Sequence, residues 1–265
     1  MRSIMLAVAL FVGGCSAQAP GESHAAFERL SSEPVAHGER LARVLGCTGC
    51  HGDDLGGRNW SDDLGVLWTA NLTQSARKWD NKQFAQALVS GKQPDGRELW
   101  DMPSYLFTQL TPAELDAVTS YVRSKPAIGQ VHPSPSMGPL LQAKRKEGVY
   151  RSSAEEVQAT GKTEAPAALG HDLARHITRA TCAECHGIDL RGRTNPIDGK
   201  STPDIRALAA NYSAADFERF LTTGSAAGGR ELPLMSEVAR GRYKYLTKAE
   251  RTAIHAYLKG LAVVP

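Results

Sequence analysis

Four of the five cysteines stand in two copies of one short motif. The first copy is Cys47-Thr48-Gly49-Cys50-His51 and the second is Cys182-Ala183-Glu184-Cys185-His186. Residues three and four positions apart share one face of a helix, so the two thiols and the histidine of a motif point the same way. Two such thiols can form thioethers with the vinyl groups of one haem, while the imidazole binds its iron. The motifs therefore predict two covalently attached haem c groups.

Two other uses of these cysteine pairs stay open. Paired cysteines also build zinc sites, and pairs 135 residues apart could meet in the folded chain. Zinc does not require the histidine that directly follows each pair, however. A thioredoxin-like redox pair would need a βαβ unit nearby, and the surrounding sequence predicts none.

A methionine in each half is the expected second axial ligand. Met102 lies 51 residues after His51, and Met235 lies 49 residues after His186. A thioether is a soft ligand that favours ferrous iron, and an iron bound by both His and Met has no open position. Pro103 favours an extended backbone at Met102, which suits a ligand loop. This pattern predicts an electron carrier rather than a binder of oxygen or peroxide.

The two methionines could have another role, and another residue could be the second axial ligand. Both methionines could simply fill the core, which is the usual role of methionine. A histidine could bind instead, although a surface role is expected for most of the candidates, which are His37, His132, His171 and His176. Arg58 and Arg193 each lie seven residues after a motif histidine. Each is expected to contact a haem propionate, the alternative being a solvated side chain.

The sequence around the motifs is duplicated, which predicts two similar domains. His51-Gly52-Asp53-Asp54-Leu55-Gly56-Gly57-Arg58 matches His186-Gly187-Ile188-Asp189-Leu190-Arg191-Gly192-Arg193, and residues 84–91 match residues 217–224. We place domain 1 at residues 34–125 (copy one) and domain 2 at residues 169–265 (copy two). The proline-containing stretch 126–168 between them is expected to be an extended linker, with a short helix over residues 145–157.

Helical periodicity dominates both copies. Residues 38–51 and 170–186 are expected to lead into the motifs, and Gly91 is a plausible end for the helix that contains Phe84 and Leu88. Thr111 and Glu114 form the pattern of a capping box before the last helix of copy one, and Thr247 and Glu250 repeat it in copy two. No run alternates long enough for a sheet, so the expected fold class is all-α, with each small helical domain packed around one haem.

The N-terminus has the pattern of a lipoprotein leader. Arg2 precedes an apolar run over residues 4–12, and Gly13-Gly14 stands directly before Cys15. We therefore expect a signal peptide over residues 1–14, acylation of Cys15, and a tether over residues 15–33 that anchors the protein to the membrane on the periplasmic side. The alternative is plain secretion after cleavage at Ala17-Gln18-Ala19, but Pro20 would then follow the cut.

The overall charge argues against nucleic acid as a partner. The net charge is +3, and the run Lys144-Arg145-Lys146 is short and followed by Glu147. Binding to a phosphate backbone needs a longer basic stripe. The sequence composition is that of an ordinary globular protein, with 42% hydrophobic and 22% charged residues.

Taken together, the chain resembles a tandem of class I cytochrome c domains. Copy one carries the resemblance at its motif, at the following glycines, at Met102-Pro103 and in the helix after Thr111; copy two carries it at its motif, Met235 and the helix after Thr247. The resemblance implies two six-coordinate haems that cycle between ferrous and ferric iron. It also implies redox protein partners, namely a dehydrogenase as donor and a cytochrome or oxidase as acceptor. Copy one is similar to the cytochrome c domains of periplasmic dehydrogenases, which often carry three haems.

Two further functions compete with electron transfer. A two-haem enzyme of the peroxidase type would keep one iron open, and one of the thiosulfate-oxidising type would use a cysteine as haem ligand, for which only Cys15 is left over. A haem-based sensor or scaffold would need an adjoining signalling segment. The sequence therefore favours an electron carrier over an enzyme.

Overall fold

The computed structural model describes residues 25–168 and 170–262, so Cys15 and the expected leader lie outside it. The described chain is mainly helical, and its strands β1 (Gly65–Val66) and β2 (Ser136–Met137) form one short antiparallel pair. The all-α fold class expected from the sequence is confirmed. In this part of the chain, no helix combines the length and apolar character needed to cross a membrane.

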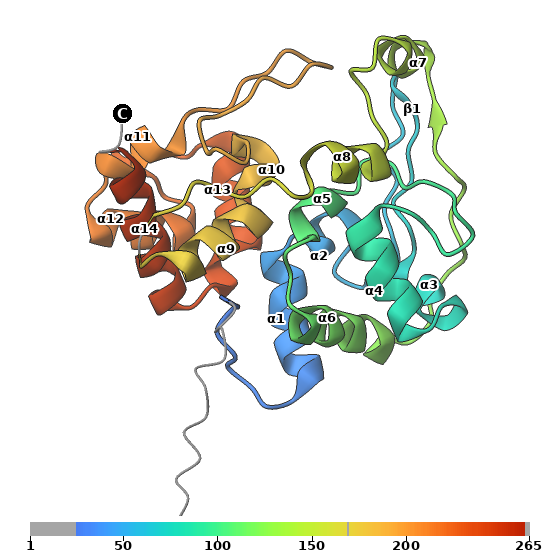
Figure 1. The fold of residues 1–265 in the computed structure, drawn as a ribbon, viewed down its shortest axis with the longest axis horizontal. Coiled ribbons are helices and arrows are strands. Elements are labelled where there is room, and N and C mark those ends of the chain that lie inside the picture. Colours follow the sequence, from blue (N-terminus) through green and yellow to red (C-terminus); the bar gives the residue numbers. More distant parts are fainter. Residues whose placement is uncertain (1–24, 169, 263–265) are drawn as a thin grey trace, which may run out of the picture.

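Two groups of helices form the two halves of the molecule (Figure 1). The helices of copy one are α1 (Pro34–Val44), α2 (Cys47–His51), α3 (Leu72–Lys78), α4 (Asn81–Ser90), α5 (Ser104–Phe107) and α6 (Pro112–Ser124). The α-helices of copy two are α9 (Asp172–Thr181), α10 (Ala183–His186), α11 (Ile205–Ala210), α12 (Ala214–Thr223), α13 (Pro233–Gly241) and α14 (Lys248–Ala262). Copy two also has the short 3-10 helices η1 (Ala227–Gly229) and η2 (Tyr243–Tyr245).

The ends of these helices follow the sequence signals. The Thr111 hydroxyl accepts from the Glu114 amide at 3.2 Å, and the Glu114 carboxylate accepts from the Thr111 amide at 2.8 Å, which completes the expected capping box. Thr247 and Glu250 make the same two bonds at the start of the last helix of copy two. Gly91 ends α4 with a φ of 69°, in the left-handed region that glycine adopts most easily.

The segment between the copies is more structured than an extended linker. It contains α7 (Pro139–Lys146) and α8 (Ser153–Thr160), where one short helix was expected. Gly148, with a φ of 72°, follows α7, and a capping box between Ser152 and Glu155 starts α8. The Ser153 amide donates to the Leu99 carbonyl at 2.9 Å. These caps stop one helix and start another, and the second packs on copy one.

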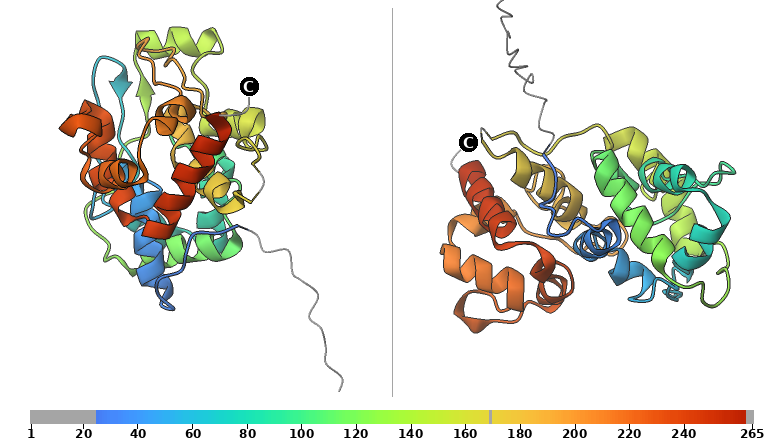
Figure 2. Two further views of the ribbon diagram at one scale, coloured as in Figure 1. Left: turned by 90° about the vertical axis from the view of Figure 1, so that its left-hand side faces the viewer. Right: turned by 90° about the horizontal axis from the view of Figure 1, so that it is seen from below.

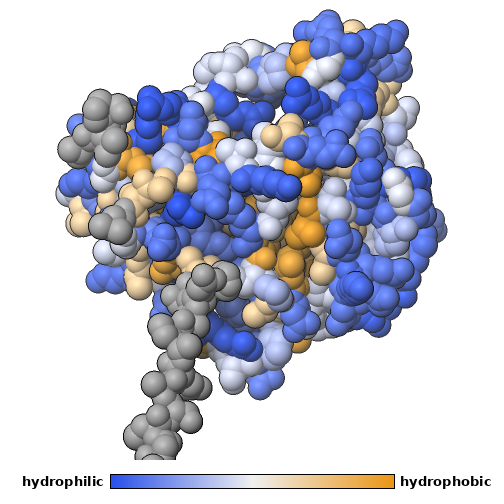
Figure 3. Space-filling model, in the orientation of Figure 1, coloured by the Kyte–Doolittle hydropathy of each residue, from blue (hydrophilic) through white to orange (hydrophobic). Residues whose placement is uncertain are grey.

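One hydrophobic core extends through both copies. Its fully buried members include Leu41 and Leu106 from copy one and Ile177 and Ile254 from copy two. The views in Figure 2 place α1 between the other helices of copy one and those of copy two. Figure 3 shows an apolar stripe on the surface where the two halves meet. The two domains therefore share buried surface instead of standing apart on a flexible linker.

Residues 25–33, which we call the strap, join the N-termini of the two last helices. The Phe27 amide donates to Glu114 of α6 at 2.8 Å, and the next amide, that of Glu28, donates to Glu250 of α14 at 2.8 Å. Glu114 also contacts His176 at 3.1 Å, and Glu250 pairs with Arg40 at 2.9 Å. The two capping-box carboxylates thus each bind a side chain from the opposite copy as well as the strap.

Candidate haem sites

One cavity of about 590 Å³ gathers the expected site residues of copy one. Cys47, Cys50, His51 and Met102 all line it, and Arg58 stands at its wall. A volume of this size lies within the range of about 300–1,000 Å³ that is typical of ligand and cofactor pockets. The fold therefore brings the motif and a methionine 51 residues further along the chain to one place.

Each motif forms a short helical turn that a glycine ends, and a second glycine precedes motif one. Gly46, with a φ of 86°, separates α1 from α2, and Gly52 and Gly187 follow the two motif histidines with φ values of 84° and 76°. The loops that come next repeat each other closely. Leu55 and Leu190 adopt left-handed φ values of 61° and 62°, and both leucines are fully buried. The duplication is thus visible in the backbone geometry as well as in the sequence.

A backbone carbonyl fixes the ring of each motif histidine. His51 Nδ1 lies 2.8 Å from the Ala70 carbonyl oxygen, and His186 Nδ1 lies 2.9 Å from that of Pro203. A carbonyl can only accept, so Nδ1 carries the proton and Nε2 keeps its lone pair. Burial lowers the pKa of both histidines. Each ring is therefore neutral and presents Nε2, the form that binds a metal, with the outer hydrogen bond typical of metal-ligating histidines.

The residue after each of these carbonyls caps a helix, a feature that the sequence analysis missed. Asn71 Oδ1 accepts from the Thr73 and Gln74 amides at the start of α3, and Asp204 Oδ1 accepts from the Arg206 and Ala207 amides at the start of α11. The signal was present in the sequence, because Thr69-Ala70-Asn71-Leu72 parallels Thr202-Pro203-Asp204-Ile205.

The paired cysteines do not resemble activated thiolates. Burial raises the pKa of the Cys47 thiol to about 12 and also raises that of Cys182, whereas reactive redox cysteines have a lowered pKa. Among residues 25–168 and 170–262, no group of three or more His, Cys, Asp or Glu side chains is arranged to hold a metal ion. The structure thus offers no zinc site that would unite the two cysteine pairs.

The two candidate methionines have different surroundings. Met102 follows Asp101, whose φ is 57°, and it precedes Pro103 and α5. The Tyr150 hydroxyl, from the segment between the copies, donates to Asp101 Oδ2 at 2.7 Å. Met235 instead lies inside α13, half-buried against the common core.

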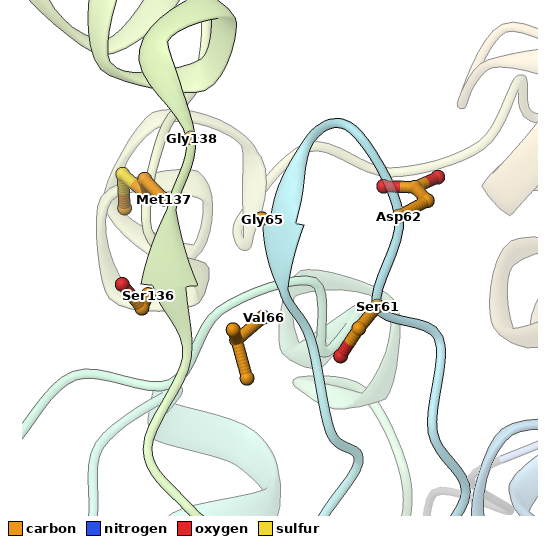
Figure 4. A pocket seen from close by; sticks show the side chains of 7 residues that line it. All are labelled: Ser61, Asp62, Gly65, Val66, Ser136, Met137 and Gly138. Atoms are coloured by element: carbon orange, nitrogen blue, oxygen red, sulfur yellow. The ribbon is translucent and has the colours of Figure 1, made fainter.

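The third methionine beyond the expected leader lies far from these residues in the fold. Met137 belongs to β2, and Figure 4 shows its side chain pointing away from β1. The hollow beside it, of about 380 Å³, is lined by short loop and strand residues and contains no motif residue.

Two of the alternative histidines, His176 and His132, make hydrogen bonds elsewhere in the fold. His176 contacts Glu114, and the Nε2 atom of His132 contacts the Gly56 carbonyl at 2.7 Å. A surface role was expected for most of these histidines, but His37 and His176 are buried, with exposures of 6% and 9%. Of the two arginines expected at propionates, Arg58 is exposed beside the cavity. Arg193 is also exposed and donates to the Glu184 carbonyl of motif two at 3.2 Å.

Comparison with known families decides the class of protein. The pattern of the cytochrome c family matches residues 35–126 and again residues 172–262. The chain belongs to the cytochrome c family. It is a tandem of two cytochrome c domains, a type of domain that holds haem c covalently and serves electron transfer. The cavity and the neutral, carbonyl-fixed motif histidines fit such a group.

Relatives of this cytochrome include components of several dehydrogenases. It is 24% identical to the fructose dehydrogenase cytochrome subunit of Gluconobacter japonicus, over 86% of this chain and 52% of that subunit. It is also 24% identical to the cytochrome c subunit of the quinone alcohol dehydrogenase of Gluconacetobacter polyoxogenes, over 98% of this chain and 61% of the relative. A further match, again at 24% identity, is a subunit of the nicotinate dehydrogenase of Pseudomonas putida, over 89% of this chain and 22% of that protein. The chain thus spans between about a fifth and three fifths of the length of these relatives.

Proposed function

We propose that this cytochrome carries single electrons from a dehydrogenase to an acceptor of the respiratory chain. The observation that carries the proposal is the single cavity that holds Cys47, Cys50 and His51 together with Met102. The dehydrogenase donor is supported by the relatives, which are named as subunits of fructose, alcohol and nicotinate dehydrogenases.

In this proposal each motif holds one haem. Cys47 and Cys50 would attach the first haem and Cys182 and Cys185 the second. His51 and Met102 would bind the iron in copy one, and His186 and Met235 would bind it in copy two. The bound haem supplies reversible one-electron chemistry at its iron. The protein holds each imidazole in one orientation through the Ala70 and Pro203 carbonyls. Arg58 and Arg193 serve as propionate contacts.

Carbon monoxide binding to the fully reduced, purified protein tests the closed coordination of both irons. Two strong sixth ligands leave no position for the gas, so we expect the visible spectrum to stay unchanged. A spectral change from either haem would contradict Met–His ligation in that copy. It would favour the alternative, a two-haem enzyme of the peroxidase type with one accessible iron. Met102→Ala and Met235→Ala then assign each ligand, since each variant should open one iron only.

We further propose that lipidated Cys15 anchors the protein on the periplasmic side of the cell envelope. The support is the apolar run of residues 4–12 followed by Gly13-Gly14-Cys15. Wild-type protein should partition with membranes and carry an acyl mass on its N-terminal peptide. Cys15→Ala should either retain its leader or leave the membrane fraction, and an unchanged, unacylated membrane protein would contradict the anchor.

A further inference from the structure

The cavity of copy one is walled partly by copy two. Glu184 and Arg242 line it together with Cys47 and Cys50. Glu184 stands between the two cysteines of motif two, and Arg242 lies at the end of α13. The Glu184 side chain, from motif two, therefore reaches the pocket of motif one. The ion pair of Glu184 with Arg242 lies between the two motifs.

Arg242 ties the motifs together through two directed contacts. Its Nη1 donates to Glu184 Oε2 at 2.8 Å, and its Nε donates to the Val44 carbonyl at 3.2 Å, three residues before Cys47. Gly46 lies directly beneath the guanidinium, and a Cβ atom there would come within 2.7 Å of Arg242 Cζ. The left-handed φ favours glycine at this position, and the missing side chain leaves room for the guanidinium of Arg242.

Stability alone does not explain this pair. The side chains of Arg242 and Glu184 are only 14% and 32% exposed. The Nη2 atom of Arg242 is buried and has no hydrogen-bond partner within the described residues. An unpartnered buried donor costs free energy, and a buried ion pair is often no more stabilising than an apolar pair. Stability alone therefore does not account for the position of these two charges.

We propose that Arg242 and Glu184 form a clasp between the copies that sets the electron affinity of both haem sites. This inference rests on the proposed two-haem electron carrier. A nearby positive charge stabilises an added electron and a negative charge destabilises it, and partial burial keeps both effects from being screened. Arg242 raises the potential of both sites. Glu184 lowers it, most strongly at motif two, to which it belongs.

Redox titration of the haem-loaded protein, followed by visible absorption, tests the clasp. Arg242→Gln should shift both midpoint potentials to lower values, and Glu184→Gln should shift both to higher values, with the larger shift at motif two. The double variant should shift less than either single variant, because the effects of the two removed charges oppose each other. Arg242→Lys keeps the charge and should keep the potentials close to those of the wild type.

Arg240→Gln provides a matched control on the same helix. Arg240 pairs with Glu231 at 3.0 Å, and both side chains are well exposed, at 44% and 63%. Solvent screens that charge, so its removal should leave both potentials in place. The shifts of the clasp variants should also persist at high salt, unlike any shift that arises from surface charge.

Two results separate the clasp from the function on which it rests. If wild-type protein resists carbon monoxide and titrates reversibly, but Glu184→Gln and Arg242→Gln leave both potentials unmoved, the clasp is wrong and the electron carrier stands. If the wild-type protein binds carbon monoxide, the carrier itself is wrong. If Arg242→Gln fails to fold, Glu184→Gln alone decides, because Glu184 is the more exposed of the two. Its removal should raise the midpoint potentials, whereas a loosened haem pocket that admits water would lower them.

Discussion

At the residue scale, the same arrangement of three consecutive residues holds each motif histidine. A threonine hydroxyl binds the carbonyl of the second motif cysteine, the next carbonyl accepts from the histidine ring, and the residue after that caps a helix. The cap differs between the copies, since Asn71 is neutral and Asp204 is ionised at neutral pH. Of the two caps, only Asp204 should therefore become protonated as the pH falls.

Asp204→Asn tests this difference. In the wild type, the hydrogen bond from the Arg206 side chain is the main cause that lowers the pKa of Asp204 from 3.8 to about 2. A carboxyl with a lower pKa in the folded state stabilises the fold above pH 3.8, and this contribution is lost as the pH falls toward 2. The melting temperature of the wild type should thus exceed that of Asp204→Asn near neutral pH, and the gap should close on acidification through this window. A gap that is independent of pH would contradict the assignment.

The residues of the motifs could be predicted, whereas those of the clasp could not. Cys47, Cys50 and His51 follow from spacing along one helix, which a sequence displays directly. Arg242 and Glu184 are 58 residues apart, and nothing in either local pattern records that they meet. The helix caps at Asn71 and Asp204 could be predicted only by comparing the two copies, because they occupy matching positions in the duplicated sequence.

At the element scale, α7 and α8 brace copy one in a way that copy two does not repeat. Trp100 stacks on Tyr150 with ring centroids 5.3 Å apart, and Arg145 lies over the Trp100 ring. These contacts hold the chain just before Met102. The prolines and polar residues of segment 126–168 favour a linker, because composition reflects only local conformational preference. Helix caps and packing on copy one, which composition does not show, stabilise α7 and α8.

Tyr150→Phe tests whether this brace positions Met102. The variant loses the hydroxyl that donates to the Asp101 carboxylate, a bond worth roughly 1.5–3 kcal/mol, while keeping the aromatic stack. We expect the absorption band of methionine bound to ferric haem to weaken for one haem and its loss with rising pH to begin earlier.

Tyr212→Phe is the control for that experiment. The Tyr212 hydroxyl accepts from the Ala227 amide at 3.3 Å in copy two, so the variant removes a tyrosine hydroxyl without touching the contact to Asp101. Equal weakening of the band in both variants, or in neither, would show that Tyr150 has no specific role at this ligand.

At the scale of the whole molecule, a buried ion pair and a buried arginine join the two copies. Arg40 and Glu250 are 10% and 0% exposed. The buried Arg179 of α9 donates to the carbonyls of Tyr105 and Thr163, which ties α5 and the end of the connecting segment to copy two. We therefore expect the two domains to unfold together in one transition.

Arg40→Ala should break this cooperativity. Removing one partner of a buried ion pair costs about 3–5 kcal/mol, and we expect a loss near the lower end, about 3 kcal/mol, because the Glu28 and Thr247 amides still bind Glu250. Calorimetry should show a lower melting temperature and a broadened or split transition. Arg97→Ala, which removes a pair with the exposed Asp95, should leave the curve unchanged. A sharp transition at the wild-type temperature in Arg40→Ala would contradict a shared fold.

The strap also has a consequence for the order in which the molecule forms. Phe27 and Glu28 bind acceptors that lie 87 and 222 residues further along the chain. Contacts of such long sequence separation form late, because the loops that they close must first be ordered. The strap is translated before either acceptor exists, and its Glu28 contact can form only when α14 is in place. We therefore expect the strap, which contains the first residues that the structure describes, to dock fully only after the last helices of both copies have formed.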